Sequence, residues 1–132
     1  MDYKDVAAGY TSNFFWFRAK IDLIKILAAK VCGGKTGSKI LIVGAGTGDE
    51  LKALSRYGRN FVVDNDQNIL PMIDERFCFE KKLADVCNLP YGDDYFDMAV
   101  SLDVFEHIEN DRRAIGEIRR VLKRNGALIS AV

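Results

Sequence analysis

One segment in the first half of the chain, from Ile40 to Asp49, constrains the fold more than any other feature. It reads Ile-Leu-Ile-Val-Gly-Ala-Gly-Thr-Gly-Asp. Four consecutive apolar residues are typical of a strand that is buried on both faces of a sheet. The glycines then turn the chain sharply toward a short helix, which we expect over residues 49–55. A strand, a glycine turn and a helix in this order indicate a parallel α/β sheet with a ligand crevice at the turn.

A second apolar run, Phe61–Val63, ends in the acidic residue Asp64. Because parallel strands end at the same edge of a sheet, this carboxylate is expected beside the glycine turn. A carboxylate in that position can accept hydrogen bonds from both hydroxyls of a ribose. The sequence therefore predicts a binding site for a cofactor that contains adenosine.

The remaining apolar runs predict three further strands and three further helices. A stripe from Phe14 to Val31 at steps of three and four residues is typical of an amphipathic helix. It is expected to start at Thr11, Ser12 or Asn13 and to end at Gly33-Gly34. The other predicted helices cover residues 69–73 and 108–122, and the predicted strands are 40–43, 61–63, 81–84, 98–102 and 127–132.

Two of these helices carry specific end signals. Pro71 has no amide hydrogen, so it must lie in the first turn of the helix around 69–73. In the later helix, Asn110 is a candidate N-cap, and Asn125-Gly126 is a candidate stop.

Strands that alternate with helices predict a three-layer, Rossmann-like α/β fold: a parallel sheet with right-handed crossovers and helices on both faces. We expect one domain, in which a helical segment over residues 1–34 packs on a core over residues 35–132.

The composition excludes several classes of partner. Lys and Arg together number 19, as do Asp and Glu, so no strong overall field attracts nucleic acid or an anionic membrane. No apolar run approaches the roughly 20 residues of a membrane span, and no secretory signal opens the chain. The three cysteines, Cys32, Cys78 and Cys87, lack metal-site spacing and are expected as free thiols in the cytoplasm.

The spacing of the glycines bears on the choice of cofactor. The dinucleotide pattern GxGxxG is absent, because Gly44, Gly46 and Gly48 are followed by Asp49. A carboxylate in the first helical turn would repel a pyrophosphate by about 1–4 kcal/mol. A phosphate-free adenosyl cofactor with a cationic sulfonium and ammonium avoids this cost. An NAD-linked oxidoreductase is therefore the least favoured interpretation.

Taken together, five motifs in order resemble the class I S-adenosylmethionine-dependent methyltransferases, especially their small-molecule branch. Their residues are 40–49, Val63-Asp64, 83–86 (Leu-Ala-Asp-Val) with 89–91 (Leu-Pro-Tyr), 96–108 (Phe-Asp-Met-Ala-Val-Ser-Leu-Asp-Val-Phe-Glu-His-Ile) and 120–126 (Arg-Val-Leu-Lys-Arg-Asn-Gly). The aromatic-Arg segment 14–20 also resembles the helix that precedes the sheet in some of these enzymes. The resemblance implies S-adenosylmethionine as cofactor, with S-adenosylhomocysteine as product and no metal.

The same resemblance implies the roles of individual residues. The glycine turn would line the methionine and ribose, Asp64 would accept the ribose hydroxyls, and Asp85 would accept the adenine amino group. Asn65 would lie along the adenine edge with Val86 stacking nearby, and the Leu102 carbonyl would accept the ammonium group. The implied cofactor-binding set is Gly44, Ala45, Gly46, Gly48, Asp64, Asn65, Asp85, Val86, Leu102 and Arg18.

Simpler explanations stay open for several of these residues. The glycines could serve only a tight turn, and Asp85 could be an ordinary turn residue. Arg18 could bind the cofactor carboxylate or be an exposed helical charge. His107, the only histidine, is a candidate general base or a surface side chain, and it lacks the partners for a metal site. Four later arginines are expected on a solvated helix face: Arg112, Arg113, Arg119 and Arg120.

The family's sheet has seven strands, whereas the predicted elements supply only five. The chain is therefore expected to be a truncated domain, a short natural variant or one half of an assembly. An uncovered last strand predicts pairing of two copies through Ala127–Val132. The expected activity is methyl transfer to an oxygen, nitrogen or carbon atom of a small-molecule acceptor. The alternative is a cofactor-binding module without independent catalysis.

Overall fold

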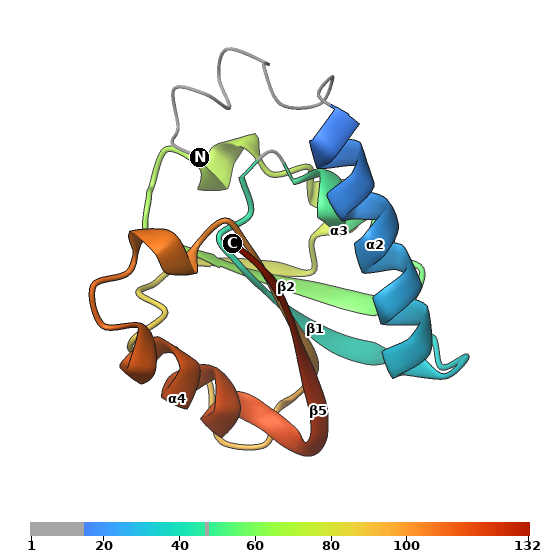
Figure 1. Ribbon diagram of the computed structural model, residues 1–132. Helices are drawn as coiled ribbons and strands as arrows, with labels where there is room; N and C mark the ends of the chain where they lie inside the picture. The colour runs from blue at the N-terminus through green and yellow to red at the C-terminus, as the bar shows by residue number, and fades with distance from the viewer. Residues whose placement is uncertain (1–14, 47) are drawn as a thin grey trace.

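A computed structural model describes residues 15–46 and 48–132 of the chain (Figure 1). The expected helix-start residues Thr11, Ser12 and Asn13, together with Thr47 of the glycine turn, lie outside the described residues.

The described residues form a five-stranded sheet in the order β3-β2-β1-β4-β5, and every neighbouring pair of strands is parallel. This arrangement confirms the predicted parallel α/β class. The strands are β1 (Ser38–Val43), β2 (Gly58–Asp64), β3 (Glu80–Leu83), β4 (Phe96–Leu102) and β5 (Leu122–Ala131).

The central strand β1 is buried on both sides, as its apolar run predicts. Its residues 40–43 are each at most 3% exposed. Val43 is in register with Val63 of β2 and with Ser101 of β4. This register brings the glycine turn, Asp64 and Leu102 to the same edge of the sheet.

Helices cover both faces of the sheet (Figure 1). The first two, α2 (Phe15–Cys32) and α3 (Asp49–Leu54), pack on one face, and α4 (Asp111–Val121) packs on the other. Alternate strand residues supply the two cores, because successive side chains point to opposite faces. Ile40 and Ile42 belong to the core under α2, and Leu41 and Val43 belong to the core under α4.

The first helix ends where its glycines predict. The Gly33 amide donates to the Ala29 carbonyl at 3.1 Å, and Gly33 adopts a left-handed φ of 54°. Glycine takes this conformation without a steric cost, which makes it the usual residue just beyond a helix.

The predicted helix over residues 69–73 is wrong. The chain there forms two single 3₁₀ turns, η1 (Leu70–Met72) and η2 (Glu75–Phe77). Pro71 does occupy the start of the first turn, but Ile73 is already extended and Asp74 caps the next turn. Ile69 and Ile73 are both 4% exposed, so the first turn still buries these two residues, whereas Met72, which the prediction also placed on the helix, is 41% exposed.

The end of the last helix also differs from the prediction. Asn110 is its N-cap as expected, and its side chain accepts from the Arg113 amide at 3.1 Å. The helix stops at Val121, however, because the next residue pairs with β4 and begins β5. The predicted stop, Asn125-Gly126, lies inside β5, beside an irregularity in the pairing with β4. A side chain at Gly126 would approach the Lys123 carbonyl to 2.9 Å, which is consistent with a bulge.

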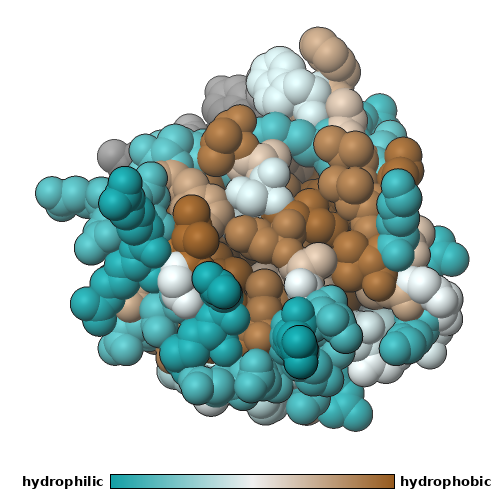
Figure 2. All heavy atoms as spheres, turned by 60° about the horizontal axis from the view of Figure 1, so that its bottom comes forward, coloured by the Kyte–Doolittle hydropathy of each residue, from teal (hydrophilic) through white to brown (hydrophobic). Residues whose placement is uncertain are grey.

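The two edges of the sheet differ in character. Edge strand β3 is short and carries Lys81 and Lys82, which oppose pairing with another strand. Edge strand β5 is longer, and its last part, 127–131, is apolar apart from Ser130. Figure 2 shows hydrophobic surface gathered in the middle of one face, with hydrophilic side chains around it. None of the described helices is apolar enough over sufficient length to span a membrane.

Candidate cofactor site

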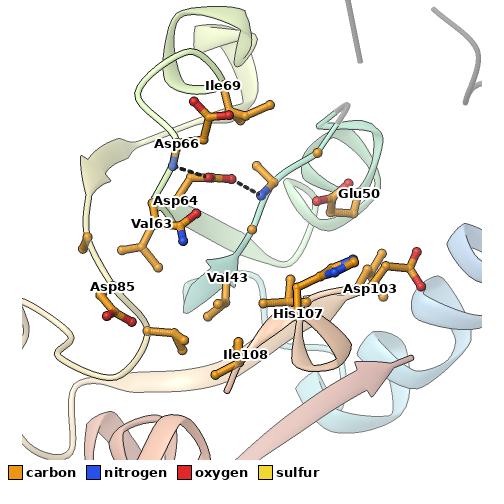
Figure 3. A pocket seen from close by; sticks show the side chains of 18 of the residues that line it. Val43, Glu50, Val63, Asp64, Asp66, Ile69, Asp85, Asp103, His107 and Ile108 are labelled. Carbon is orange, nitrogen blue, oxygen red and sulfur yellow. Dashed lines mark hydrogen bonds between the residues drawn. The ribbon is translucent and has the colours of Figure 1, made fainter. Parts of the chain in front are cut away.

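A cavity of 320 Å³ lies at the carboxyl ends of β1, β2 and β4 (Figure 3). Its position is the ligand crevice of open parallel sheets, and its volume is in the usual range of small-molecule sites. Nine of the residues that the sequence singles out line it: Gly44, Ala45, Gly46, Asp64, Asn65, Asp85, Val86, Leu102 and His107.

Two predicted residues are not part of the lining. Gly48 is the N-cap residue of α3, with a φ of 77°. Arg18 is exposed on α2, so the geometry gives no support to the prediction that it binds the cofactor carboxylate. The preceding residue, Phe17, is 7% exposed and does line the cavity.

Asp64 is fixed between two backbone amides (Figure 3). Its Oδ2 accepts from the Ala45 amide at 3.3 Å, and its Oδ1 accepts from the Asp66 amide at 2.9 Å. Partial burial raises the pKa of Asp64, and these amide hydrogen bonds act in the opposite direction. The end of β2 and the glycine turn thus hold one carboxylate in a single orientation at the cavity.

Backbone contacts also define the glycine turn. The Gly44 amide donates to the Val63 carbonyl at 2.9 Å, and the Gly48 amide donates to the Ala45 carbonyl at 2.7 Å. Gly44 has a φ of 71°, which a residue with a side chain rarely adopts. The turn therefore depends on glycine for its shape.

Asp85 combines the two interpretations that the sequence left open. It is exposed, and its Oδ1 accepts from the Cys87 amide at 2.8 Å, as in an ordinary turn. It also lines the cavity, beside the buried Val86. The Ala84 amide donates to the Asp64 carbonyl at 2.9 Å, which connects this loop to the end of β2.

Two arginines of α4, the exposed Arg113 and the half-buried Arg120, also hold this loop, a role that the prediction of a solvated helix face did not include. Arg120 donates to the carbonyls of Leu89 and Tyr91 at 3.2 and 2.8 Å, and Arg113 donates to the Cys87 carbonyl at 2.9 Å. Glu117 accepts from the Leu89 amide at 2.8 Å and from Arg120 Nε at 2.7 Å. The positions of Asp85 and Val86 thus depend on a hydrogen-bond network anchored on α4.

His107 ends the 3₁₀ turn η3 (Phe105–His107), which follows β4. Its backbone amide donates to the Val104 carbonyl at 3.0 Å. The side chain is exposed to solvent and lines the cavity, as Figure 3 shows. It is therefore accessible both to a bound molecule and to water.

Sequence reasoning missed three acidic residues of the lining: Glu50, Asp66 and Asp103. Asp49, which the sequence predicts to repel a pyrophosphate, is exposed and absent from the lining, whereas its neighbour Glu50 is 3% exposed and lines the cavity. Asp103 was detectable, because it follows the apolar run of β4 as Asp64 follows that of β2. It adopts a φ of 53° and forms an ion pair with Lys20 of α2.

The lining therefore has a strongly acidic character. It contains five carboxyl groups and one imidazole, and no Lys or Arg from the described residues lines it. Such a cavity disfavours phosphate and favours a ligand with positive charge. The described part of the chain contains no cluster of His, Cys, Asp and Glu that could hold a metal ion. All three cysteines have free thiols.

The sheet order is that of a Rossmann-like protein, and the acidic glycine-turn cavity favours a nucleoside cofactor without phosphates. Residues 41–130 match the family model described as a methyltransferase domain. The chain belongs to this family, the S-adenosylmethionine-dependent methyltransferases of class I.

Individual relatives agree with this assignment. The chain is 33% identical over 95 residues to demethylmenaquinone methyltransferase of Thermotoga maritima, covering 69% of this chain and 42% of that protein. A structure from Methanococcus maripaludis, assigned to the S-adenosylmethionine-dependent methyltransferases, has the same fold. Its TM-score is 0.77 at 22% identity, over 98% of this chain and 64% of that one.

A second similar structure is the cyclase SpnF, with a TM-score of 0.69 at 28% identity. The match covers 84% of this chain and 44% of the cyclase. Its name describes a cyclisation, so similarity to this group does not by itself fix the reaction. The chain spans less than half the length of the curated relatives that it matches.

S-adenosylmethionine is the cofactor that this family membership implies. The residues present fit it in two respects. The amide-held carboxylate of Asp64 can accept hydrogen bonds from a ribose, and the acidic lining suits a ligand with a sulfonium and an ammonium group.

Proposed function

We propose that the chain binds S-adenosylmethionine in the acidic cavity and supports methyl transfer to a small-molecule acceptor. The observation that carries this proposal is the carboxylate of Asp64, held by the amides of Ala45 and Asp66 at the carboxyl end of β2. A fixed acceptor needs no reordering when it binds a diol, so more of its hydrogen-bond energy stabilises the complex.

Eight of the cavity residues have a proposed part in binding. Gly44, Ala45 and Gly46 contact the methionine and ribose, and Asp64 accepts from both ribose hydroxyls. The other assignments are Asn65 along the adenine edge, Asp85 to the adenine amino group, Val86 against the adenine ring and the Leu102 carbonyl to the ammonium group.

When bound, the cofactor supplies a methyl group that is activated by a positively charged sulfur. The chain's own residues contribute orientation and exclusion of water, since the buried side chains of Phe17, Val86 and Ile69 line the cavity. His107 is the proposed general base, because it reaches the cavity and remains accessible to an acceptor.

Calorimetric titration tests the choice of cofactor. S-adenosylhomocysteine should bind to the protein, and NAD should bind at least ten-fold more weakly because its pyrophosphate would meet the carboxyl groups of the lining. Equal affinity for the two compounds, or tighter binding of NAD, would contradict the proposal.

A second function, cofactor binding without independent catalysis, has one observation in its favour. The chain spans less than half the length of its curated relatives, and acceptor pockets in this fold are built from variable segments. Both functions require the same cofactor residues. Turnover on a panel of oxygen, nitrogen and carbon acceptors separates them, because only the enzyme would consume S-adenosylmethionine.

The edge strand β5 supports association of two copies through Ala127–Val132. This segment carries no charged side chain that would oppose strand pairing, and Val132 is 80% exposed. We further propose a cytoplasmic location, because three free thiols suit a reducing compartment.

A further inference from the structure

Glu50 stands apart from the other acidic residues of the cavity because it is almost completely buried. It lies in the first turn of α3, is 3% exposed and lines the cavity, whereas the other four carboxyl residues there are half-buried or exposed. Figure 3 shows it on the opposite side of the glycine turn from Asp64. None of the hydrogen bonds or ion pairs among the described residues joins its side chain to another side chain.

A buried carboxyl group without a cationic partner is costly in its charged form. Burial raises the pKa of Glu50 to about 8, its own backbone amide acts against this rise, and the neighbouring charge of Asp49 adds to it. Glu50 is therefore mainly protonated in the free protein at neutral pH. A cation placed beside it would reverse this preference, because an opposite charge nearby stabilises the carboxylate.

We propose that Glu50 is the counter-ion for the positive charge of the bound cofactor and that it loses a proton when this charge binds. The inference rests on the proposed function, since it requires S-adenosylmethionine in this cavity. The proton passes from the Glu50 carboxyl group to the buffer, and the carboxylate that remains neutralises the sulfonium or ammonium group. Because a nearby positive charge stabilises the Glu50 carboxylate, Glu50 selects for a cationic ligand.

Other ionisable groups line the same cavity or lie next to residues that line it, and they contribute to its charge. The lining groups are Asp64 at the end of β2, Asp66 after β2, Asp85 after β3, and Asp103 and His107 after β4; the adjacent groups are Asp49 on α3 and Lys20 of α2, which is paired with Asp103. Imidazole is the side chain that ordinarily titrates between pH 5 and 8. A His107→Asn variant therefore has to be measured beside the Glu50 variant.

Isothermal titration calorimetry at pH 6, 7 and 8, in buffers of different ionisation enthalpy, tests the proposal with two probes. S-adenosylmethionine carries both cations, and adenosine carries neither. With the unaltered protein at pH 7, S-adenosylmethionine should release close to one proton. Its affinity should rise by up to about ten-fold per pH unit between pH 6 and 8, because one proton is linked to binding. Adenosine should release no proton.

The Glu50→Gln variant should abolish both the proton release and most of the pH dependence, and it should leave adenosine binding unchanged. Glu109→Gln, which removes an exposed carboxyl group outside the cavity, should behave like the unaltered protein. His107→Asn should retain the proton release. Proton release that persists in Glu50→Gln, or is absent from the unaltered protein, would overturn the proposal.

The design also separates this inference from the proposed function. If neither probe binds, the cofactor assignment fails, whereas binding of both without a proton step refutes only the role of Glu50. Should Glu50→Gln not fold, carbon-13 NMR of the unaltered protein gives an independent answer. The Glu50 carboxyl carbon should titrate near pH 8 in the free protein and at clearly lower pH with S-adenosylmethionine; an unshifted titration would overturn the proposal.

Discussion

A Cβ atom added to Gly44 would lie 2.5 Å from Cγ2 of Val104, so the glycine turn and the loop after β4 are in direct contact beside the cavity. This distance is shorter than real Cβ contacts allow. The contact joins the glycine turn, which forms the proposed methionine site, to the loop after β4, which leads to His107.

Gly44→Ala should therefore lower both stability and affinity. The left-handed φ of 71° and the clash with Val104 should each cost about 1–3 kcal/mol of unfolding free energy. Affinity for S-adenosylhomocysteine should fall at least about ten-fold. Chemical denaturation and calorimetry measure the two effects.

A matched control and a rescue variant show how much of the loss in Gly44→Ala comes from the clash with Val104 and how much from the backbone conformation. Gly116→Ala adds a methyl group to α4 where nothing lies within 4 Å, so it should be neutral or slightly stabilising. Adding Val104→Ala to Gly44→Ala removes the clash and should recover part of the loss, but not the cost of the backbone conformation. Full stability of Gly44→Ala alone would contradict the described turn.

Asp64→Ala should remove the proposed ribose acceptor. Two charge-assisted hydrogen bonds contribute roughly 1.5–3 kcal/mol each, so the Kd for S-adenosylhomocysteine should rise about 100-fold or more. Asp22→Ala, which changes an exposed aspartate on α2, should bind normally. Unchanged affinity in Asp64→Ala would reject the site.

His107→Ala tests the proposed general base. Methyl transfer to a responsive acceptor should slow by about 100-fold, and the affinity for S-adenosylhomocysteine should stay within about two-fold. The two measurements are turnover under saturating cofactor and calorimetric titration. A normal rate with normal binding would show that His107 is only a surface residue of the cavity rim.

Glu117→Gln should weaken the network that holds the loop of Asp85 and Val86. The side-chain hydrogen bond from Arg120 lowers the pKa of Glu117 below its ordinary value of 4.5, burial opposes this, and the Leu89 amide adds to it. Loss of this charge should cost about 1–2 kcal/mol of unfolding free energy at pH 7.

The pH dependence follows from the same shift. Because the pKa of Glu117 is lower in the folded than in the unfolded protein, its stabilisation is present above about pH 4.5 and is lost as pH falls further. The difference in stability between Glu117→Gln and the unaltered protein should therefore shrink toward pH 3. A difference that is constant with pH would contradict this role for the charge.

Association through β5 should appear as a dimer in light scattering at micromolar concentration. Val132→Lys places a charge beside the last residue of the strand and should favour the monomer, because charged residues oppose pairing at sheet edges. A strict monomer for the unaltered protein would reject the proposed pairing.

Local patterns were sufficient to locate all five strands and the central part of the site, although β5 begins at Leu122, before the predicted start at Ala127. The sequence predicted the positions of three features: the apolar run 40–43, the glycines after it and Asp64. Each depends only on residues that are close by in the sequence. The helix over 69–73 was wrong because Ile69 and Ile73 flank a single 3₁₀ turn and are both buried, as they would be on one face of an α-helix. Spacing alone does not distinguish these structures when Pro71 lies between them.

The sequence by itself determined the parallel sheet, its glycine turn and the carboxylate at the end of β2, because burial on both faces and backbone sterics act locally. Only the tertiary structure placed Glu50 in the cavity in preference to its neighbour Asp49. Only the tertiary structure, likewise, brought Arg120 of α4 within hydrogen-bond distance of the carbonyls of Leu89 and Tyr91. Burial and long-range hydrogen bonds depend on which elements meet in space. A residue's own neighbours in the sequence do not contain that information.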